Sequence, residues 1–186
     1  MKQDTAIISA IANGDREAFR KLYHLFAEKV YNTALSFVKN EQEAEEVTQD
    51  VFTKVFQNAH QFKGDASPST WIYRIAVNTS LNLIKKKKRF TLVDLSNAEK
   101  EIPQFDHPGV LMEKRENARL LFEVIDTLPD NQRTAFILSF VEDLPRQEVA
   151  NIMELSLKAV ESLLQRAKGN LRKVLEKSYP NRRKKR

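Results

Sequence analysis

The sequence predicts an all-α protein built from two small helical domains that are joined by a flexible linker. Only four of its 186 residues are glycine and 41% are hydrophobic, which is the composition of a folded, strongly helical chain. Apolar residues recur at three- and four-residue steps through both halves, as in amphipathic helices. Between the halves, residues 91–115 lose this period and contain two prolines and a glycine. We therefore expect domains at residues 1–90 and 116–178, and a basic tail at 179–186.

The composition also narrows the classes of function. A formal net charge of +6 is compatible with a polyanionic partner. The chain has no cysteine and its three histidines lie far apart, so we expect no metal site and no cofactor. No glycine loop that could cradle a phosphate and no histidine paired with a nucleophile is present, so an enzyme is not expected. The N-terminus lacks the pattern of a signal peptide and no apolar run approaches ~20 residues, which predicts a cytoplasmic protein.

Two long helices are expected in the first half, one from Asp15 to about Asn40 and one directly after it. The second starts with EQEAEEVTQD, residues 41–50, which holds five carboxylates and no cation. Here Glu43, Glu46 and Asp50 share one face at i, i+3 and i+7, and we call them the acidic ridge. By pattern alone the ridge is an outward, solvated helix face. The apolar residues of this helix are Ala44, Val47, Val51, Phe52 and Val55.

The third helix is expected after the loop KGDASPS, residues 63–69, with Ser69 or Thr70 as its cap. Its apolar stripe is Ile72, Ile75, Ala76, Thr79 and Leu83, and a second stripe is Arg74, Asn78, Asn82, Lys85 and Arg89. Cations neutralise phosphates and Asn pairs with base edges, so the second stripe suits nucleic acid. The alternative is a solvated face whose C-terminal lysines complement the helix dipole. Five adjacent cations, residues 85–89, favour nucleic acid, because a phosphate backbone would relieve their mutual repulsion.

Two aromatic residues, Phe62 and Trp71, flank this loop. Aromatic rings beside a basic face stack on unpaired bases, worth about 1–3 kcal/mol per base. A single Trp at the start of a helix is also a common core residue. The two interpretations remain open from the sequence.

The second half predicts a helix-turn-helix. A helix around residues 120–125 ends before Pro129, and another spans about Asn131 to Val141. A short helix opened by Pro145 and a long one after Ser156 complete the layout. The long helix would present to a major groove the residues Lys158, Glu161, Ser162, Gln165, Arg166, Lys168 and Arg172. An ordinary three-helix bundle is the alternative.

The order of these motifs resembles the two-domain sigma factors of the extracytoplasmic-function (ECF) group, bacterial factors that direct RNA polymerase to promoters. The resemblance covers nearly the whole chain. It is carried by EAEEVTQDVFTKVF, STWIYRIAVNTSLNLIKKKKR, LPDNQRTAFILSFVEDLPRQEVANIM and SLKAVESLLQRAKGNLR. It implies an alternative sigma factor that binds core polymerase and promoter DNA, melts the minus-ten region and is held by an anti-sigma factor.

The resemblance also implies roles for individual residues. Docking on the coiled coil of the largest polymerase subunit falls to Glu43, Glu46, Gln49, Asp50 and Phe52. The minus-ten element is contacted by Phe62, Lys63, Gly64, Asp65, Trp71, Arg74, Asn78, Asn82, Lys85, Lys86 and Arg89. The minus-thirty-five element is contacted by Arg146, Lys158, Ala159, Glu161, Ser162, Gln165, Arg166 and Lys168, in a domain that also meets the polymerase flap.

Three positions depart from the family pattern. Glu154 stands in the helix-turn-helix turn where many relatives have glycine. Glu161 and Leu163 replace frequent basic residues on the recognition helix, and Glu161 is expected to accept a hydrogen bond from a cytosine amino group instead. The remaining alternative is a stand-alone helix-turn-helix regulator that uses residues 1–90 for ligand binding or dimerisation.

Overall fold

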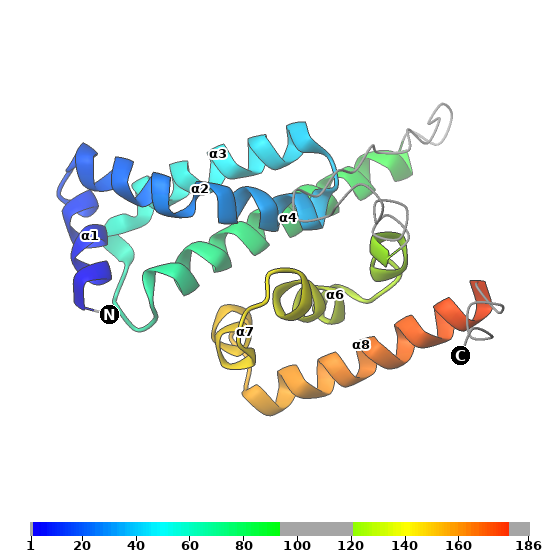
Figure 1. Ribbon diagram of the computed structural model, residues 1–186. Coiled ribbons are helices and arrows are strands. Elements are labelled where there is room, and N and C mark those ends of the chain that lie inside the picture. Colours follow the sequence, from blue (N-terminus) through cyan, green and yellow to red (C-terminus); the bar gives the residue numbers. More distant parts are fainter. Residues whose placement is uncertain (1, 94–120, 179–186) are drawn as a thin grey trace. The chain divides into compact units, whose positions relative to one another are not determined.

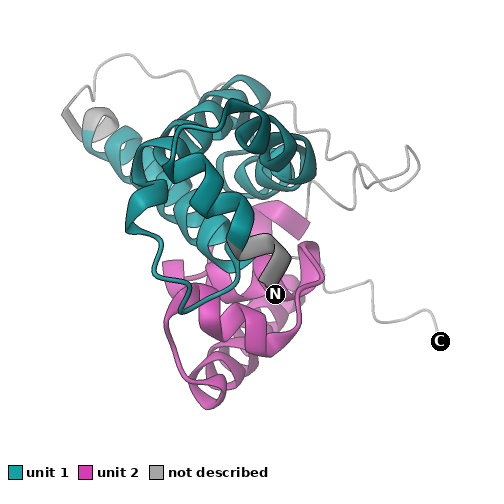
Figure 2. Cartoon of the chain, turned by 90° about the vertical axis from the view of Figure 1, so that its left-hand side faces the viewer, with its two compact units in different colours: residues 1–107 teal, residues 108–186 magenta. Residues whose placement is uncertain are grey.

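The computed structural model describes residues 2–93 and 121–178, with side chains within 6–89 and 121–177, and every regular element in these ranges is helical. The chain divides into two compact units, residues 1–107 and 108–186, coloured separately in Figure 2. The prediction of an all-α protein with two helical domains is therefore confirmed. Most of the expected linker and the whole basic tail lie outside the described residues. Within those residues, no helix is long and apolar enough to cross a membrane.

Unit 1 is a helical bundle whose long helices α2 (Arg16–Val38), α3 (Glu41–Asn58) and α4 (Pro68–Val93) run beside one another (Figure 1). The short helix α1 (Lys2–Ala12) lies across one end, where it meets the 3₁₀ turn η1 (Ala59–Gln61). The apolar stripes predicted from the sequence meet in one core, which includes Leu22, Val30, Val47, Val51 and Ile72. Burial of these side chains from water is the main force that holds the bundle together.

The helix ends of unit 1 are set by local sequence. Asp15 caps α2 by accepting hydrogen bonds from the Glu17 and Ala18 backbone N–H groups, at 2.9 and 3.0 Å. Asn40 caps α3 in the same way through the Glu43 N–H, at 3.0 Å. Such caps satisfy backbone donors that have no partner inside the helix.

The start of α4 differs from the expected cap. Neither Ser69 nor Thr70 caps the helix, because Ser67 Oγ accepts the hydrogen bond from the Thr70 N–H at 3.1 Å. Pro68 then occupies the first helical position, where its missing N–H costs nothing. The observed cap, Ser67, therefore lies two or three residues before the predicted one, because Pro68 is the first residue of the helix and not a break before it.

Unit 2 contains a helical turn at residues 121–125, then α6 (Asp130–Phe136), α7 (Arg146–Met153) and α8 (Leu157–Ser178). A π-helical segment, η3 (Ile137–Val141), continues α6, so the expected helix from Asn131 to Val141 is present with a wider last turn. The helix α8 packs against both α6 and α7. This is the predicted helix-turn-helix arrangement.

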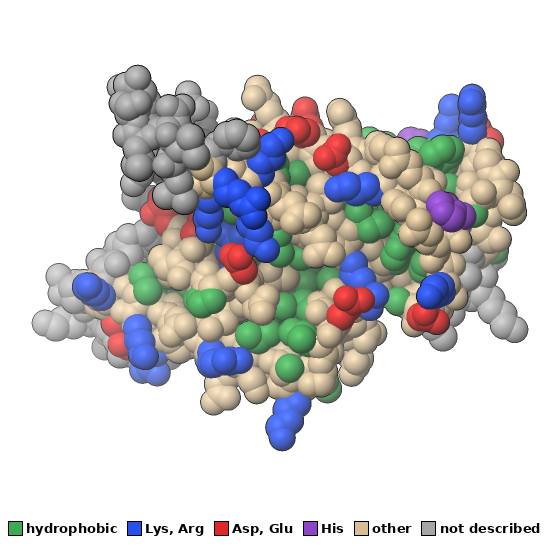
Figure 3. Space-filling view, turned by 180° about the vertical axis from the view of Figure 1, so that it is seen from behind, with side chains coloured by type: hydrophobic (Ala, Val, Ile, Leu, Met, Phe, Trp, Pro, Cys, Tyr) green, Lys and Arg blue, Asp and Glu red, His purple; other side chains and the backbone are tan. Residues whose placement is uncertain are grey.

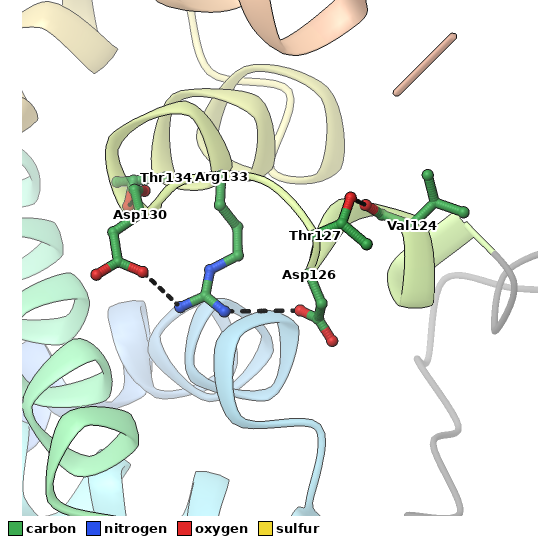
Figure 4. A network of polar contacts seen from close by, with 6 residues as sticks. All are labelled: Val124, Asp126, Thr127, Asp130, Arg133 and Thr134. Atoms are coloured by element: carbon green, nitrogen blue, oxygen red, sulfur yellow. Dashed lines mark hydrogen bonds and ion pairs between the residues drawn. The ribbon is translucent and has the colours of Figure 1, made fainter. Parts of the chain in front are cut away.

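Arg133 joins α6 to the turn that precedes it (Figure 4). Its guanidinium lies 3.6 Å from Asp126 and 3.8 Å from Asp130. Burial lowers the pKa of the Arg133 guanidinium, and the neighbouring Asp130 carboxylate acts in the opposite direction. The two carboxylates hold this side chain over the junction between the helical turn and α6.

The turn between α7 and α8 forces Glu154 into the left-handed region, with φ 56° and ψ 39°. Leu155 N–H reaches back to Ala150 O at 3.0 Å, which closes the end of α7 as a Schellman-type cap. The predicted need for φ > 0 at Glu154 is therefore confirmed. Glycine would adopt this conformation without the steric cost that a side chain brings.

Candidate nucleic-acid interface

The polar stripe of α4 lies on the surface as predicted. Asn78, Asn82 and the cations from Lys85 to Arg89 are exposed, whereas Ile72 and Ala76 on the apolar stripe are buried. Arg74, nearer the start of the helix, is half-buried. The exposed part of the stripe therefore combines amide groups with a continuous positive run, which are the groups that bind base edges and phosphates.

The acidic ridge of α3 does not stand apart from this stripe. Lys87 on α4 donates to Glu43 on α3 and forms an ion pair with it. The other two ridge residues, Glu46 and Asp50, line a groove of about 190 Å³ together with Asn82 and Lys86 of α4. The ridge and the α4 cations are thus two sides of one groove.

A part-buried hydrogen bond joins two of the residues that line this groove. Lys54 Nζ on α3 donates to Thr79 Oγ1 on α4 at 2.9 Å. The sequence placed Thr79 correctly on the inward stripe but gave no sign of its partner. The contacts that Lys54 and Lys87 make across helices were not predicted, because such pairing has no local pattern. Figure 3 shows the result on one face of the molecule, where Lys and Arg side chains gather next to Asp and Glu side chains.

One residue expected on the polymerase-docking surface is placed differently. Phe52 is only 3% exposed, and its ring centroid lies 4.7 Å from that of Tyr23 within the unit 1 core. It packs against α2 and presents almost no surface for a partner. Phe56, one turn later, is 46% exposed and packs edge-on against Phe19 at 5.3 Å.

The two aromatic residues beside the loop contact each other. The rings of Phe62 and Trp71 lie 5.2 Å apart, and both residues are half-buried against the unit 1 core. Trp71 thus packs on the core as one interpretation predicted, and its stacking on an unpaired base stays a prediction. Lys63, Gly64 and Asp65 are exposed beside this pair.

The residues of α8 that were predicted to contact DNA are exposed to solvent, with one exception. Its exposed members are Lys158, Glu161, Ser162, Gln165, Arg166 and Lys168, with Ala159 half-buried and Arg146 exposed on α7. Arg166 Nε donates to Ser162 O at 3.2 Å, and Lys168 lies 4.6 Å from the centre of the Phe140 ring. The helix therefore offers several cations and hydrogen-bonding groups along one face.

Two positions on α8 differ from expectation. Leu163 is 9% exposed and faces inward, so its replacement of a basic residue removes no contact with DNA. Glu161 lies 3.7 Å from Arg146 on α7, an ion pair that the sequence did not predict, and its contact with a cytosine stays a prediction. Leu157, at the start of α8, and Phe140 of η3 are exposed apolar residues of unit 2.

The comparisons with known proteins agree with this geometry. Residues 22–90 match the family model of Sigma-70 region 2, and residues 118–171 match that of Sigma-70 region 4. The chain is 31% identical to RNA polymerase sigma-H factor of Pseudomonas aeruginosa, over 94% of this chain and 95% of that protein. It is 30% identical to ECF RNA polymerase sigma factor SigW of Bacillus subtilis, over 90% and 94% of the two chains.

Solved structures show the same fold. CnrH, in complex with the cytosolic domain of CnrY, superposes with a TM-score of 0.68 at 22% identity, covering 93% of this chain and 97% of CnrH. The sigma factor RpoE of Bartonella quintana, in complex with the anti-sigma factor NepR, gives a TM-score of 0.66 at 20% identity, over 85% and 96%.

A bundle with an Asn and cation stripe, followed by a helix-turn-helix unit, defines a two-domain sigma factor of the Sigma-70 type. The chain belongs to the ECF group of RNA polymerase sigma factors. It is an alternative sigma factor and acts in the initiation of transcription.

Proposed function

We propose that unit 1 docks on core RNA polymerase through Glu46, Asp50 and Gln49 and opens the minus-ten element with α4, while unit 2 reads the minus-thirty-five element with α8. The observation that carries this division is the exposure of Asn78, Asn82 and residues 85–89 on the side of α4 opposite its buried stripe. Melting requires groups that hold unpaired bases and neutralise the backbone, and this stripe supplies both.

Polymerase docking is supported by the acidic ridge and by exposed aromatic side chains of α2 and α3. Glu46, Asp50 and Gln49 are exposed on α3. Phe56 and Tyr23 are also exposed, at 46% and 42%, and take the place that Phe52 was expected to fill. Exposed aromatic residues beside charged ones are frequent anchors of protein interfaces.

Unit 2 is suited to duplex DNA. Lys158 lies in the first turn of α8, the end of a recognition helix that enters a major groove, and Gln165 and Arg166 follow two turns later. Arg146 on α7 is positioned to contact a phosphate, with Glu161 holding its guanidinium. The domain limits 1–90 and 116–178 fit this division of labour.

The other partners follow from relatives. CnrH and RpoE were each solved with a protein bound, and the RpoE partner is an anti-sigma factor. We propose that this chain is likewise held by an anti-sigma factor in the cytoplasm and that it performs no catalysis of its own.

A pull-down on core polymerase tests the docking surface. Glu46→Lys and Asp50→Lys together reverse two charges on the ridge and should abolish capture of the polymerase. Glu28→Lys and Glu123→Lys, which change exposed glutamates outside the ridge, form the matched control and should leave capture intact. Unchanged capture by the ridge variant would refute the docking assignment.

A further inference from the structure

Helix α8 carries a glycine on its outer face that neither packing nor backbone conformation requires. Gly169 lies inside this 22-residue helix and is exposed. Its φ is not positive, and a Cβ atom added to it would meet no atom within 4 Å. Glycine is a poor helix former, because its backbone loses the most freedom on folding. Gly169 therefore weakens α8 with no benefit inside the protein, which points to a ligand that approaches the helix closely.

Gly169 continues the row of α8 residues that face away from the core of unit 2. Lys158, Ser162, Gln165 and Gly169 are spaced at i, i+4, i+7 and i+11, which places them within about 60° of one another around the helix. We call these four residues the reading line. The opposite side of α8 is buried, at Val160, Leu164, Ala167 and Leu171. The face that α8 offers to DNA thus has side chains at three positions and none at the fourth.

The length of α8 indicates what Gly169 meets. At 1.5 Å per residue, Gly169 lies about 18 Å along the axis from Leu157, the first residue of the helix. A major groove is only about 12 Å wide. A straight helix whose first turns enter the groove has therefore left it by Gly169 and lies over the sugar–phosphate backbone that borders it. A side chain at this position would hold the helix away from that backbone.

The charges around Gly169 suit phosphates. Arg166 and Lys173, one turn before and one turn after the glycine, are both exposed. Arg172 is exposed on the other side, where its Nε lies 3.0 Å from the carboxylate of Glu176. Arg and Lys side chains neutralise backbone phosphates without reading the base sequence. A glycine on a helix also admits a protein partner, but these cations and the place on the reading line favour DNA.

We propose that the second half of α8 is a separate binding site for the sugar–phosphate backbone of duplex DNA. Gly169 is the point of closest approach, and Arg166 and Lys173 bind phosphates on either side of it. This inference rests on the proposed function, in which α8 reads the minus-thirty-five element, and it adds a contact beyond the bases that are read. Gly169 is a positioning residue, because its missing side chain sets the distance between the helix and the DNA.

Substitution of the glycine should change stability and DNA affinity in opposite directions. Gly169→Ala and Gly169→Leu both introduce better helix formers and should raise the melting temperature by about 2–4 °C. In the complex with core polymerase, affinity for the closed promoter should fall about twofold for Ala and roughly tenfold for Leu, since the longer side chain separates the surfaces more. Asn131→Leu adds the same side chain to an exposed position of α6 and should leave affinity unchanged.

Methylphosphonate substitution, which removes the charge of one phosphate at a time, locates the contact. At one or two phosphates that border the minus-thirty-five element, it should weaken wild-type binding roughly tenfold. The same substitutions should have little further effect on Gly169→Leu. Lys173→Gln should weaken binding about equally on all promoter sequences and reduce the salt slope by about one. Lys21→Gln, the same change at an exposed position of α2, should leave the slope unchanged.

The outcomes separate this inference from the proposed function. If Gly169→Leu raised the melting temperature and kept full promoter affinity while Lys158→Ala lost affinity, the backbone site would be refuted and the reading role of α8 would stand. If neither variant changed promoter affinity, both claims would fall. If Gly169→Leu lost capture of core polymerase and responded to every methylphosphonate as wild type does, the glycine would face a protein, and the inference would be overturned.

Discussion

The two helices assigned to promoter DNA, α4 in unit 1 and α8 in unit 2, are built differently. On α4 the functional stripe shares a groove with the acidic ridge of α3, and Lys87 pairs with Glu43 across it. On α8 the predicted readers are exposed, and the one ion pair described between α7 and α8 joins Glu161 to Arg146. On α4, Lys87 is therefore paired with a carboxylate of another helix, whereas on α8 the described ion pair, Arg172 with Glu176, lies within the helix and away from Lys158.

This difference has a physical consequence for binding. A cation that already has a carboxylate partner must exchange it for a phosphate, so it contributes less net free energy than a free one. Unit 2 is then suited to a first, duplex contact. In unit 1, the α4 cations should bind DNA more strongly once another partner binds the acidic ridge.

The largest expected effect is on stability, and it distinguishes the buried Phe52 from the exposed Phe56 in unit 1. Phe52→Ala should lower the free energy of unfolding by about 3–5 kcal/mol, the usual cost of removing a buried Phe. Phe56→Ala should cost much less stability but weaken capture of core polymerase. Denaturant unfolding and a polymerase pull-down measure the two effects, and weak capture by a stable Phe52→Ala variant would contradict the assignment.

A similar test applies to α8 in unit 2. Leu163→Arg should destabilise the protein by about 2–4 kcal/mol, because a charge would replace a buried apolar side chain. Glu161→Arg should be nearly neutral for stability and should increase minus-thirty-five binding about equally on all sequences, since it frees Arg146 for a phosphate and adds a cation. If the variant lost affinity only for sites that carry one particular base, Glu161 would be shown to contact that base directly.

The α4 amides should matter only once DNA is open. Asn78→Ala and Asn82→Ala are each expected to weaken the open complex roughly tenfold, within the range of one base contact. Closed-complex binding should change little, because no unpaired base is present there. Equal losses in both complexes, measured by filter binding and permanganate footprinting, would indicate a duplex contact.

One substitution in the turn between α7 and α8 should make the protein slightly more stable. Glu154→Gly should raise the free energy of unfolding by up to about 1 kcal/mol, because glycine tolerates φ 56° without steric cost. Glu176→Gly, at an exposed site within α8, is the contrasting control and should destabilise the protein. An equal destabilisation by both variants would contradict the strain assigned to Glu154.

The smallest effect concerns the ion pair across the α3–α4 groove. Glu43→Gln should cost at most about 1 kcal/mol of stability and should increase the affinity of the free protein for single-stranded DNA at low salt. Glu41→Gln, on the same turn of α3, carries the same charge change and serves as control. The expected difference between the two variants should disappear at high salt.

Much of this arrangement could be predicted from the sequence, because it depends on local periodicity. The buried stripe through Ile72 and Ala76 and the exposed Asn78 and Asn82 follow directly from helical spacing. The left-handed turn at Glu154, by contrast, was expected only from the family resemblance, because many relatives have glycine at this position.

The remaining differences have two origins. Phe52 lies on the apolar face of α3, and its docking role came from the family resemblance; in the structure it packs against Phe19 and Tyr23 of α2. Leu163 lies at the edge of the α8 stripe, where packing within the folded unit settles its direction. The Glu43–Lys87 pair joins two segments that no sequence period relates.

Run-off transcription with purified core polymerase, on a pool of genomic promoters, tests the central claim most directly. The account predicts transcripts that depend on the added protein, start at promoters sharing two elements, and disappear with Asn78→Ala combined with Asn82→Ala. Binding of the protein to duplex DNA without any protein-dependent start site would contradict it and indicate a regulator that acts without polymerase docking.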